Sequence, residues 1–291
     1  MSHMELSSSP DGCRKIDREA REVVSIRFAG DSGDGIQLIG DQFATIAAAD
    51  GNEVVTFPDF PAEIRAPAGT VSGVSGYQVN VGGEVYTTGD QIDILIAMNP
   101  AAIKANLSHL KEAGVIIANV DAFTEENIQK AGFDSNPLEG DLQLKYRIYP
   151  VHITSITRDI LKDTGLSLKE MDKCKNFFAL GLICWLLNEP IDRSLKWIEN
   201  KFKTKKQFID ANQKVLKAGY DCGAAKEIFT THYFIKKKHK KPGVYRYVNG
   251  NSAVSLGLVT AAHKANRPLF LASYPITPAS EILQELSNYV R

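Results

Sequence analysis

The chain has 291 residues, of which 34 are basic and 34 acidic, and 44% are hydrophobic. A neutral chain with this much apolar content can bury a sizeable core, and its charge gives no reason to expect nucleic acid or a membrane as partner. No apolar run reaches the roughly 18 residues of a membrane span, and the polar residues 1–20, which we expect to be a disordered leader, lack the apolar region of a signal peptide.

Cysteine is rare and scattered in this sequence. No two of the four cysteines form a C-x-x-C pair, which argues against a zinc site or an iron–sulfur cluster held by this chain alone. Small buried hydrophobes or inert thiols in a reducing cytoplasm are the simpler interpretation. The four residues are Cys13, Cys174, Cys184 and Cys222.

The opening of the chain is typical of an α/β fold. An apolar run at Val23–Ala29 predicts a buried strand, and the glycine-rich turn Gly30–Gly35 follows it. Residues 36–50 then place their apolar side chains on one face of a helix, and Glu53–Phe57 predicts a second strand. Strand, helix and strand in this order predict a mostly parallel sheet with flanking helices.

Further along, apolar runs and glycine breaks predict a hairpin, two more strands and a helix that begins with proline. The expected elements are hairpin strands at Val74–Val81 and Glu84–Thr87, a strand at Ile92–Ala97, a helix at Pro100–Ala113 ended by Gly114, and a strand at Val115–Asn119.

The second half divides at a basic run. Residues 153–220 predict helices, of which Asn176–Leu187 is apolar all round and therefore buried. The run at 236–243 predicts either a solvated linker or a basic contact to a phosphate or acidic partner. We therefore expect one domain at 21–235 and a second at 244–291. The second, predicted as a helix at Asn251–Asn266, a strand at Leu269–Ser273 and a helix from Ala279, is too short for a core of its own.

The turn between the first strand and helix allows two interpretations. Its glycines would let backbone N–H groups approach a phosphate, with the helix N-terminus favouring the anion. However, Leu38 stands where the dinucleotide pattern needs glycine, and Ile36-Gln37 stand where a P-loop has Lys-Ser/Thr. A pyrophosphate contact and a tight turn without a ligand both remain open. The residues of this candidate cofactor site are Gly30, Ser32, Gly33 and Gly35.

Two stretches of sequence resemble the 2-oxoacid:ferredoxin oxidoreductases. The first runs from GDSGDGIQLIGDQF through FPAEIRAPAG and DILIAMNPAAIKAN to ANQKVLKAGYD, and it resembles the γ domain of that family over about residues 22–229. The second, GNSAVSLGLVTAAHKANRPLFLASYPITPASEI, resembles the start of the α domain that binds the pyrimidine side of thiamine diphosphate. A γ domain fused ahead of the α domain is typical of the 2-oxoglutarate enzymes.

The resemblance implies a subunit of an enzyme that decarboxylates a 2-oxoacid oxidatively. Thiamine diphosphate with Mg²⁺ and an iron–sulfur cluster would supply the chemistry, ferredoxin would take the electrons, and coenzyme A would take the acyl group. A β subunit or a part of the chain beyond this sequence would hold most of these cofactors, so we expect a cytoplasmic hetero-oligomer. Because Arg291 comes before the segment that supplies the glutamate that activates thiamine, we expect this chain to be inactive alone.

The same resemblance points to particular residues. Thr277 in YPITP would give its hydroxyl to the carboxylate or keto oxygen of the substrate, next to Tyr274 and Pro275, although Thr277 also fits a helix N-cap with Pro278 after it. Arg65 is a candidate for a carboxylate or phosphate contact or for the domain interface, with an ion pair to Glu63 or Asp59 as the alternative.

Asn99 follows a buried strand, where ligand sites lie in such sheets, but it fits a helix cap equally well. Ser252 stands where many relatives have an acidic residue.

Other functions stay open at this point. The chain could be a coenzyme A-binding or nucleotide-binding module, or an assembly module, without catalysis of its own, and the YPITPAS motif argues against a plain binding module. The 2-oxoacid could also be pyruvate or a branched-chain acid, since the fused order of the domains is the reason for favouring 2-oxoglutarate.

Overall fold

The computed structural model describes residues 17–61, 66–225, 229, 231–236, 241–274 and 276–289. The contacts within the chain divide it into two compact units, Met1–His239 and Lys240–Arg291. The division falls inside the basic run at 236–243.

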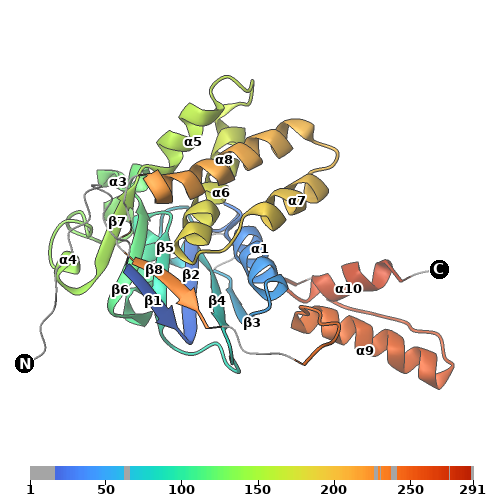
Figure 1. Cartoon of the computed structure of the whole chain (residues 1–291). Coiled ribbons are helices and arrows are strands. Elements are labelled where there is room, and N and C mark those ends of the chain that lie inside the picture. Colours follow the sequence, from blue (N-terminus) through green and yellow to red (C-terminus); the bar gives the residue numbers. More distant parts are fainter. Residues whose placement is uncertain are drawn as a thin grey trace, which may run out of the picture. The chain divides into compact units, whose positions relative to one another are not determined.

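The first unit is built on a six-stranded sheet with the order β3-β4-β2-β5-β6-β7 (Figure 1). A separate pair of parallel strands, β1 and β8, joins segments from the two ends of the unit. The strands are β1 (Asp17–Arg21), β2 (Val23–Asp31), β3 (Glu53–Asp59), β4 (Val74–Gly82), β5 (Ile92–Ala97), β6 (Leu110–Asn119), β7 (Arg147–Val151) and β8 (Thr231–Ile235).

The expected mostly parallel sheet is confirmed, with one exception. Strands β2, β5, β6 and β7 are parallel neighbours, whereas β4 is antiparallel to both β2 and β3. Strand β3 therefore runs in the same direction as β2 but is separated from it by β4. A simple βαβ unit would have placed the two strands side by side.

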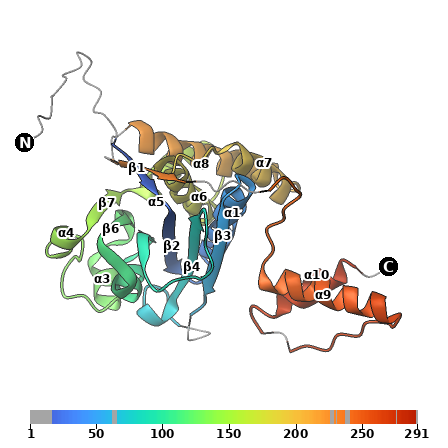
Figure 2. The same cartoon turned by 60° about the horizontal axis from the view of Figure 1, so that its bottom comes forward.

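The helices of the first unit lie on both faces of this sheet (Figure 2). Residues 153–220 are mainly helical as predicted, and every side chain of α6 from Asn176 to Leu186 is buried. The helices are α1 (Ile36–Ala49), α2 (Pro100–Asn106), α3 (Glu125–Lys130), α4 (Leu142–Lys145), α5 (Ile153–Leu161), α6 (Leu168–Leu186), α7 (Asp192–Lys201) and α8 (Lys206–Ala225).

Successive residues of the central strands point to opposite faces of the sheet, and both faces are buried. Phe28 of β2 packs against Phe43 of α1, with ring centroids 6.0 Å apart. Its neighbour Ala29 belongs to a core cluster on the opposite face, together with Ile103 of α2 and Leu95 of β5. Burial on both faces explains why these strands are continuous apolar runs rather than alternating patterns.

The predicted helix at Pro100–Ala113 is too long. Helix α2 ends at Asn106, a short 3-10 turn covers Leu107–His109, and β6 already begins at Leu110. Gly114 therefore lies within a strand instead of ending a helix. Leu110 packs in the core under the sheet, and this tertiary contact outweighs the local helical pattern.

The predicted hairpin strand at Glu84–Thr87 does not form. Side chains of β4 bind carbonyls at the end of this segment and directly after it: the amide of Asn80 donates to Thr87 O at 3.1 Å, and the amide of Gln78 donates to Thr88 O at 2.6 Å. Side chains thus take the place of a paired strand.

Two further differences concern residues outside the predicted elements. Strand β1 starts at Asp17, inside the stretch that we expected to be a leader, and it pairs with β8. Strand β7 was not predicted, because its sequence RIYPV is short and contains a proline. It lies at the edge of the sheet, where proline is tolerated.

The second unit consists of two helices joined by an irregular segment. The predicted first helix is confirmed as α9 (Gly250–Ala265), and the second is α10 (Ser280–Ser287). The expected strand at Leu269–Ser273 does not form, and Phe270 within it is 89% exposed. A strand needs a neighbour to pair with, and no strand is described in this unit.

Candidate functional site

A polar cleft lies where the parallel strands end. The chain leaves β2 through α1 towards the β3 edge of the sheet, and it leaves β5 through α2 towards β6 on the other side. Connections that diverge in this way open a crevice at the carboxyl ends of the strands, which is where ligands bind in open α/β sheets.

This cleft, which we call the switch-point cleft, has a volume of about 320 Å³. Its lining comes from the segments at the ends of β2, β3, β5 and β6 and from helices α3, α5 and α6. The lining residues are Asp31, Asp34, Ala68, Gly69, Met98, Asn99, Asn119, Asp121, Ala122, Asn127, Lys130, Thr154, Arg158, Asp172 and Lys175.

The glycine-rich turn forms one wall of the cleft through its aspartates. Gly33 and Gly35 have φ values of +88° and +87°, which explains why glycine is needed at these two positions. Gly30 has a packing role, because a Cβ atom there would lie 3.0 Å from Cβ of Met98. The N–H group of Ser32 already donates to Gly73 O at 3.1 Å, so it is occupied within the protein.

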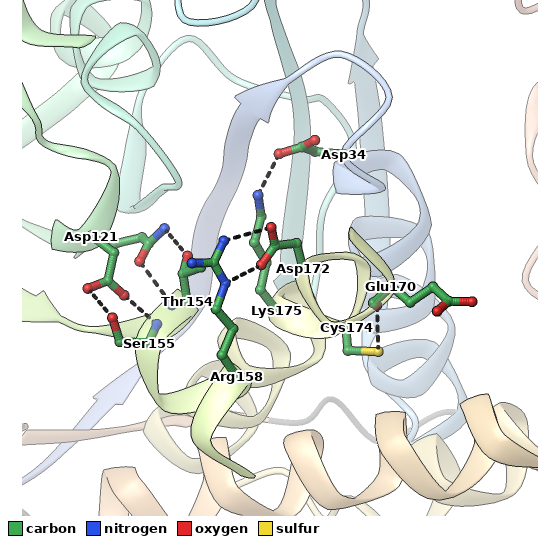
Figure 3. A network of polar contacts seen from close by, with 10 residues as sticks. Asp34, Asp121, Thr154, Ser155, Arg158, Glu170, Asp172, Cys174 and Lys175 are labelled. Carbon is green, nitrogen blue, oxygen red and sulfur yellow. Dashed lines mark hydrogen bonds and ion pairs between the residues drawn. The ribbon is translucent and has the colours of Figure 1, made fainter. Parts of the chain in front are cut away.

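Helix α6 holds this turn in place (Figure 3). The Lys175 ammonium contacts Asp34 Oδ2 at 2.7 Å, and the Asn176 side-chain amide donates to the backbone carbonyl of Asp34. No side chain caps α1 in the described structure. The turn is therefore fixed through Asp34 by a helix about 140 residues further along the chain.

A second cluster lies around Asp121, at the end of β6. Asp121 accepts hydrogen bonds from the backbone N–H of Ser155 at 2.7 Å and from its hydroxyl at 2.8 Å, and His152 Nδ1 lies 2.8 Å away. Burial would raise the pKa of the Asp121 carboxyl, but the hydrogen bonds from Ser155 and His152 outweigh burial and hold this pKa below its usual value. Asp121 is therefore a fixed negative charge at neutral pH.

The basic side chains of the cleft are all in ion pairs. Arg158 binds both carboxylate oxygens of Asp172, at 2.7 and 2.8 Å, and this hydrogen bonding raises the pKa of the guanidinium. Lys130 pairs with Glu126 at 2.7 Å, and Lys175 pairs with Asp34. Because these cations are paired and four carboxylates line the wall, the cleft suits a ligand that presents amides and hydroxyls better than a dense phosphate group.

Asn99 fits both of its predicted roles at once. Its side-chain oxygen accepts from the N–H of Ala102 at 2.8 Å, which caps α2, and the residue also lines the cleft. Next to it, the Asn119 amide donates to Thr154 Oγ1 at 3.0 Å.

The remaining predicted residues are Arg65, Tyr274, Pro275 and Thr277. Arg65 and Pro275 fall outside the described residues, and the ion pair suggested between Arg65 and Asp59 is not described. Asp59 pairs with the buried Arg27. In the second unit, Tyr274 is 80% exposed and Thr277 lies in a turn.

The predicted N-cap role of Thr277 is wrong, because α10 begins only at Ser280, with Ala279 as its N-cap. Ser252 donates its hydroxyl to Glu285, so it joins α9 to α10.

Sequence reasoning missed most of the charged lining. Asn119 and Asp121 could have been predicted, since they lie at or just after the end of a predicted strand. Asp172 and Lys175 were not, because α6 approaches the cleft from a distant part of the sequence.

Cys174 and Cys184 do not line the cleft. Burial raises the pKa of Cys174 to about 12 and also raises that of Cys184, so both stay protonated at neutral pH. Among the described residues, no group of three or more His, Cys, Asp or Glu side chains is arranged to hold a metal ion. None of the described helices is long and apolar enough to cross a membrane.

The relationship to known proteins is clear at the level of family. Residues 25–222 match the pyruvate ferredoxin/flavodoxin oxidoreductase family. The chain belongs to this family. Over 274 residues, or 94% of the chain, it is 46% identical to the 2-oxoglutarate oxidoreductase subunit KorA of Mycobacterium tuberculosis, and it covers 42% of that protein. The common γ subunit of the pyruvate/ketoisovalerate oxidoreductases of Pyrococcus furiosus is 24% identical over half of the chain and is covered to 80%.

Solved structures agree with this family. The 2-oxoglutarate:ferredoxin oxidoreductase from Magnetococcus marinus, determined with 2-oxoglutarate, coenzyme A and succinyl-CoA bound, matches 92% of the chain with a TM-score of 0.69 and 25% identity. The chain covers 41% of that protein, so it spans less than half the length of this structure and of KorA. A keto/oxoacid ferredoxin oxidoreductase γ subunit from Geobacter sulfurreducens, at 20% identity and a TM-score of 0.51, shows the same fold. The resemblance read from the sequence is thus confirmed.

Proposed function

We propose that this chain forms the γ domain and the opening of the thiamine domain in the α subunit of a 2-oxoglutarate:ferredoxin oxidoreductase. The observation behind the proposal is the 46% identity to KorA, which extends over 94% of the chain. A stand-alone γ subunit would account for the first unit only. The Magnetococcus marinus enzyme, which binds 2-oxoglutarate, also matches across both units.

The reaction would convert 2-oxoglutarate and coenzyme A to succinyl-CoA and CO₂. Two electrons would pass to two ferredoxins, and one proton would be released. When bound, thiamine diphosphate with Mg²⁺ stabilises the negative charge left on the substrate by decarboxylation, and iron–sulfur clusters carry the electrons away. The described cysteines of this chain do not form a cluster site. We therefore assign the cluster and most of the thiamine site to a β subunit in a cytoplasmic hetero-oligomer.

This chain would contribute contacts to the two organic substrates. Thr277 would donate its hydroxyl to the carboxylate or keto oxygen of 2-oxoglutarate, with Tyr274 and Pro275 beside it and Arg65 as a further anion contact. The exposure of Tyr274, at 80%, supports a role in contacts made outside this unit.

Coenzyme A would contact the switch-point cleft at Asn99 and at the turn of Gly30, Ser32, Gly33 and Gly35. Its amide and hydroxyl groups fit the paired charges of the cleft better than its phosphates do.

A chimaeric enzyme tests this function. The matching region of Mycobacterium tuberculosis KorA is replaced by this chain, the chimaera is produced with its β subunit, and coenzyme A-dependent reduction of an electron acceptor is measured with 2-oxoglutarate and with pyruvate. We expect turnover with 2-oxoglutarate. An assembled chimaera that turns over neither acid would favour an assembly role, and one that prefers pyruvate would contradict the substrate.

The Thr277→Val variant of the chimaera tests the substrate contact. Losing a hydrogen bond to a charged group costs about 1.5–3 kcal/mol, so kcat/KM for 2-oxoglutarate should fall by at least about tenfold while KM for coenzyme A stays constant. Thr260→Val is the matched control, because the Thr260 hydroxyl bonds only to Leu256 O within α9. Equal kinetics in the two variants would remove Thr277 from the active site.

A further inference from the structure

A second, smaller cavity lies at the opposite end of the sheet from the switch-point cleft. Its volume is about 110 Å³, and it is bounded by the beginnings of β2, β5, β6 and β7, together with β1 and β8. The lining residues are Arg21, Val24, Asp93, Lys111, Glu112, Ala113, Gly114, Arg147 and Tyr233. None of them belongs to the cleft, so the two sites are separate.

Tyr233 is the central side chain of this cavity. Guanidinium groups lie against its ring, with Cζ of Arg21 at 5.6 Å and Cζ of Arg147 at 5.9 Å from the ring centroid. The residue is only 4% exposed, yet its hydroxyl has no hydrogen-bond partner in the described part of the chain. The hydroxyl is not one of the fully buried polar atoms, so a small ligand in the cavity can reach it and accept its hydrogen bond.

Arg147 is held in position without using its terminal nitrogens. Its Nε donates to the carbonyl of Ala113 at 3.1 Å, and the ring of Tyr233 supports the guanidinium plane. Both terminal nitrogens lack a hydrogen-bond partner among the described residues. A fixed guanidinium with a free edge matches the geometry of an oxyanion.

The other cations of the cavity are paired with carboxylates, so Arg147 is its unpaired cation among the described residues. Lys111 pairs with Asp93 at 2.7 Å, and Asp93 also accepts from the backbone of Ser25 at 2.9 Å, so this carboxylate is already satisfied. Arg21 pairs with Glu19 at 2.6 Å, outside the cavity lining. Glu112 is exposed, and its carboxylate is free to turn towards solvent.

We propose that this cavity is a phosphate-binding site, in which Arg147 and the Tyr233 hydroxyl donate to the phosphate oxygens. The volume fits one phosphate group and is too small for a nucleotide. Burial raises the pKa of Tyr233, so the hydroxyl keeps its proton and can donate at neutral pH. The proposal does not depend on the oxidoreductase function.

Calorimetric titration of the full chain with inorganic phosphate, at constant ionic strength in chloride, tests the site. We expect saturable binding by the unchanged chain. Tyr233→Phe keeps the ring between the guanidiniums and removes only the donor, so its affinity should be about tenfold weaker. Glu112→Gln should bind two- to threefold more tightly, because a repelling carboxylate is removed.

Charge removal needs its own control. Arg147→Gln should weaken binding by at least tenfold, whereas Arg193→Gln, which removes the same charge from the exposed surface of α7, should bind like the unchanged chain. Absence of saturable heat with phosphate would overturn the proposal. So would equal affinities of Tyr233→Phe and the unchanged chain, since the phosphate would then bind elsewhere.

Methyl phosphate distinguishes the two sources of the phosphate group. Binding of methyl phosphate with the same dependence on Tyr233 would support a phosphomonoester of a larger molecule as the ligand. Binding of inorganic phosphate alone, with that dependence, would support the free ion.

Discussion

At the scale of single residues, Asp121 shows how one carboxylate joins three parts of the site. Asp121 follows β6. It accepts hydrogen bonds from Ser155 at the start of α5, and it lies beside His152, the residue after β7. Its side chain is only 14% exposed. A partly buried carboxylate that binds donors in this way favours the ionised form in the folded state.

The lowered pKa of Asp121 predicts a pH-dependent contribution to stability. This contribution is fully present above the unfolded-state pKa of about 3.9 and is lost as pH falls through the lower folded-state pKa. Asp121→Asn should therefore be about 1–2 kcal/mol less stable than the unchanged chain at pH 7, with the difference shrinking as the pH falls below the unfolded-state pKa of about 3.9. Urea unfolding at a series of pH values measures it.

The matched control is Asp210→Asn, which changes an exposed carboxylate of α8 and should stay within about 0.5 kcal/mol at every pH. A difference for Asp121→Asn that stays the same from pH 7 to the acid end of the series would show that the charge of Asp121 contributes nothing.

At the scale of elements, helices α6 and α8 cross with their backbones in contact. A Cβ atom on Gly219 would lie 2.1 Å from the carbonyl oxygen of Phe178, and one on Gly181 would lie 2.2 Å from that of Leu216. These atoms belong to helix backbones and cannot move aside easily. The crossing therefore depends on both glycines, and it fixes the helix that positions Lys175 and Asp172.

Gly219→Ala should consequently destabilise the protein, although alanine is the better helix former. The gain in helix propensity is about 1 kcal/mol, whereas overpacking against a backbone costs about 3 kcal/mol or more, so a net loss of at least 2 kcal/mol is expected. Lys217→Ala on the exposed face of the same helix should change stability by less than about 0.5 kcal/mol. Equal melting temperatures for the two variants would mean that the helices do not approach this closely.

Sequence patterns predicted which helices and strands form better than they predicted which of these elements lie next to each other in space. The buried strands and the apolar α6 followed from their composition alone. The insertion of β4 between β2 and β3 did not, because strand order depends on tertiary pairing. The same limit holds for the cleft: Asn99 was predicted because it directly follows a strand, whereas Asp172 and Lys175 reach it only through the packing of α6.

At the scale of the whole molecule, the two units differ sharply in burial. Leu286 is the one buried hydrophobic side chain described in the second unit, whereas large apolar side chains there are exposed. About 50 residues cannot bury a stable core by themselves, so α9 and α10 need further protein surface. Examples of the exposed side chains are Val254, Phe270, Ile276 and Leu283.

Removing residues 240–291 should therefore leave the first unit folded and equally stable. Trp185 in α6 and Trp197 in α7 are the only two tryptophans, so fluorescence reports the first unit alone. The urea midpoint by fluorescence should agree between the shortened and full chains within the error of the measurement. Far-ultraviolet circular dichroism of the full chain should show an additional loss of helix at lower urea, as α9 and α10 unfold first. A clearly lower fluorescence midpoint for the shortened chain would instead show that the second unit stabilises the first, and the two could not be treated as independent folding units.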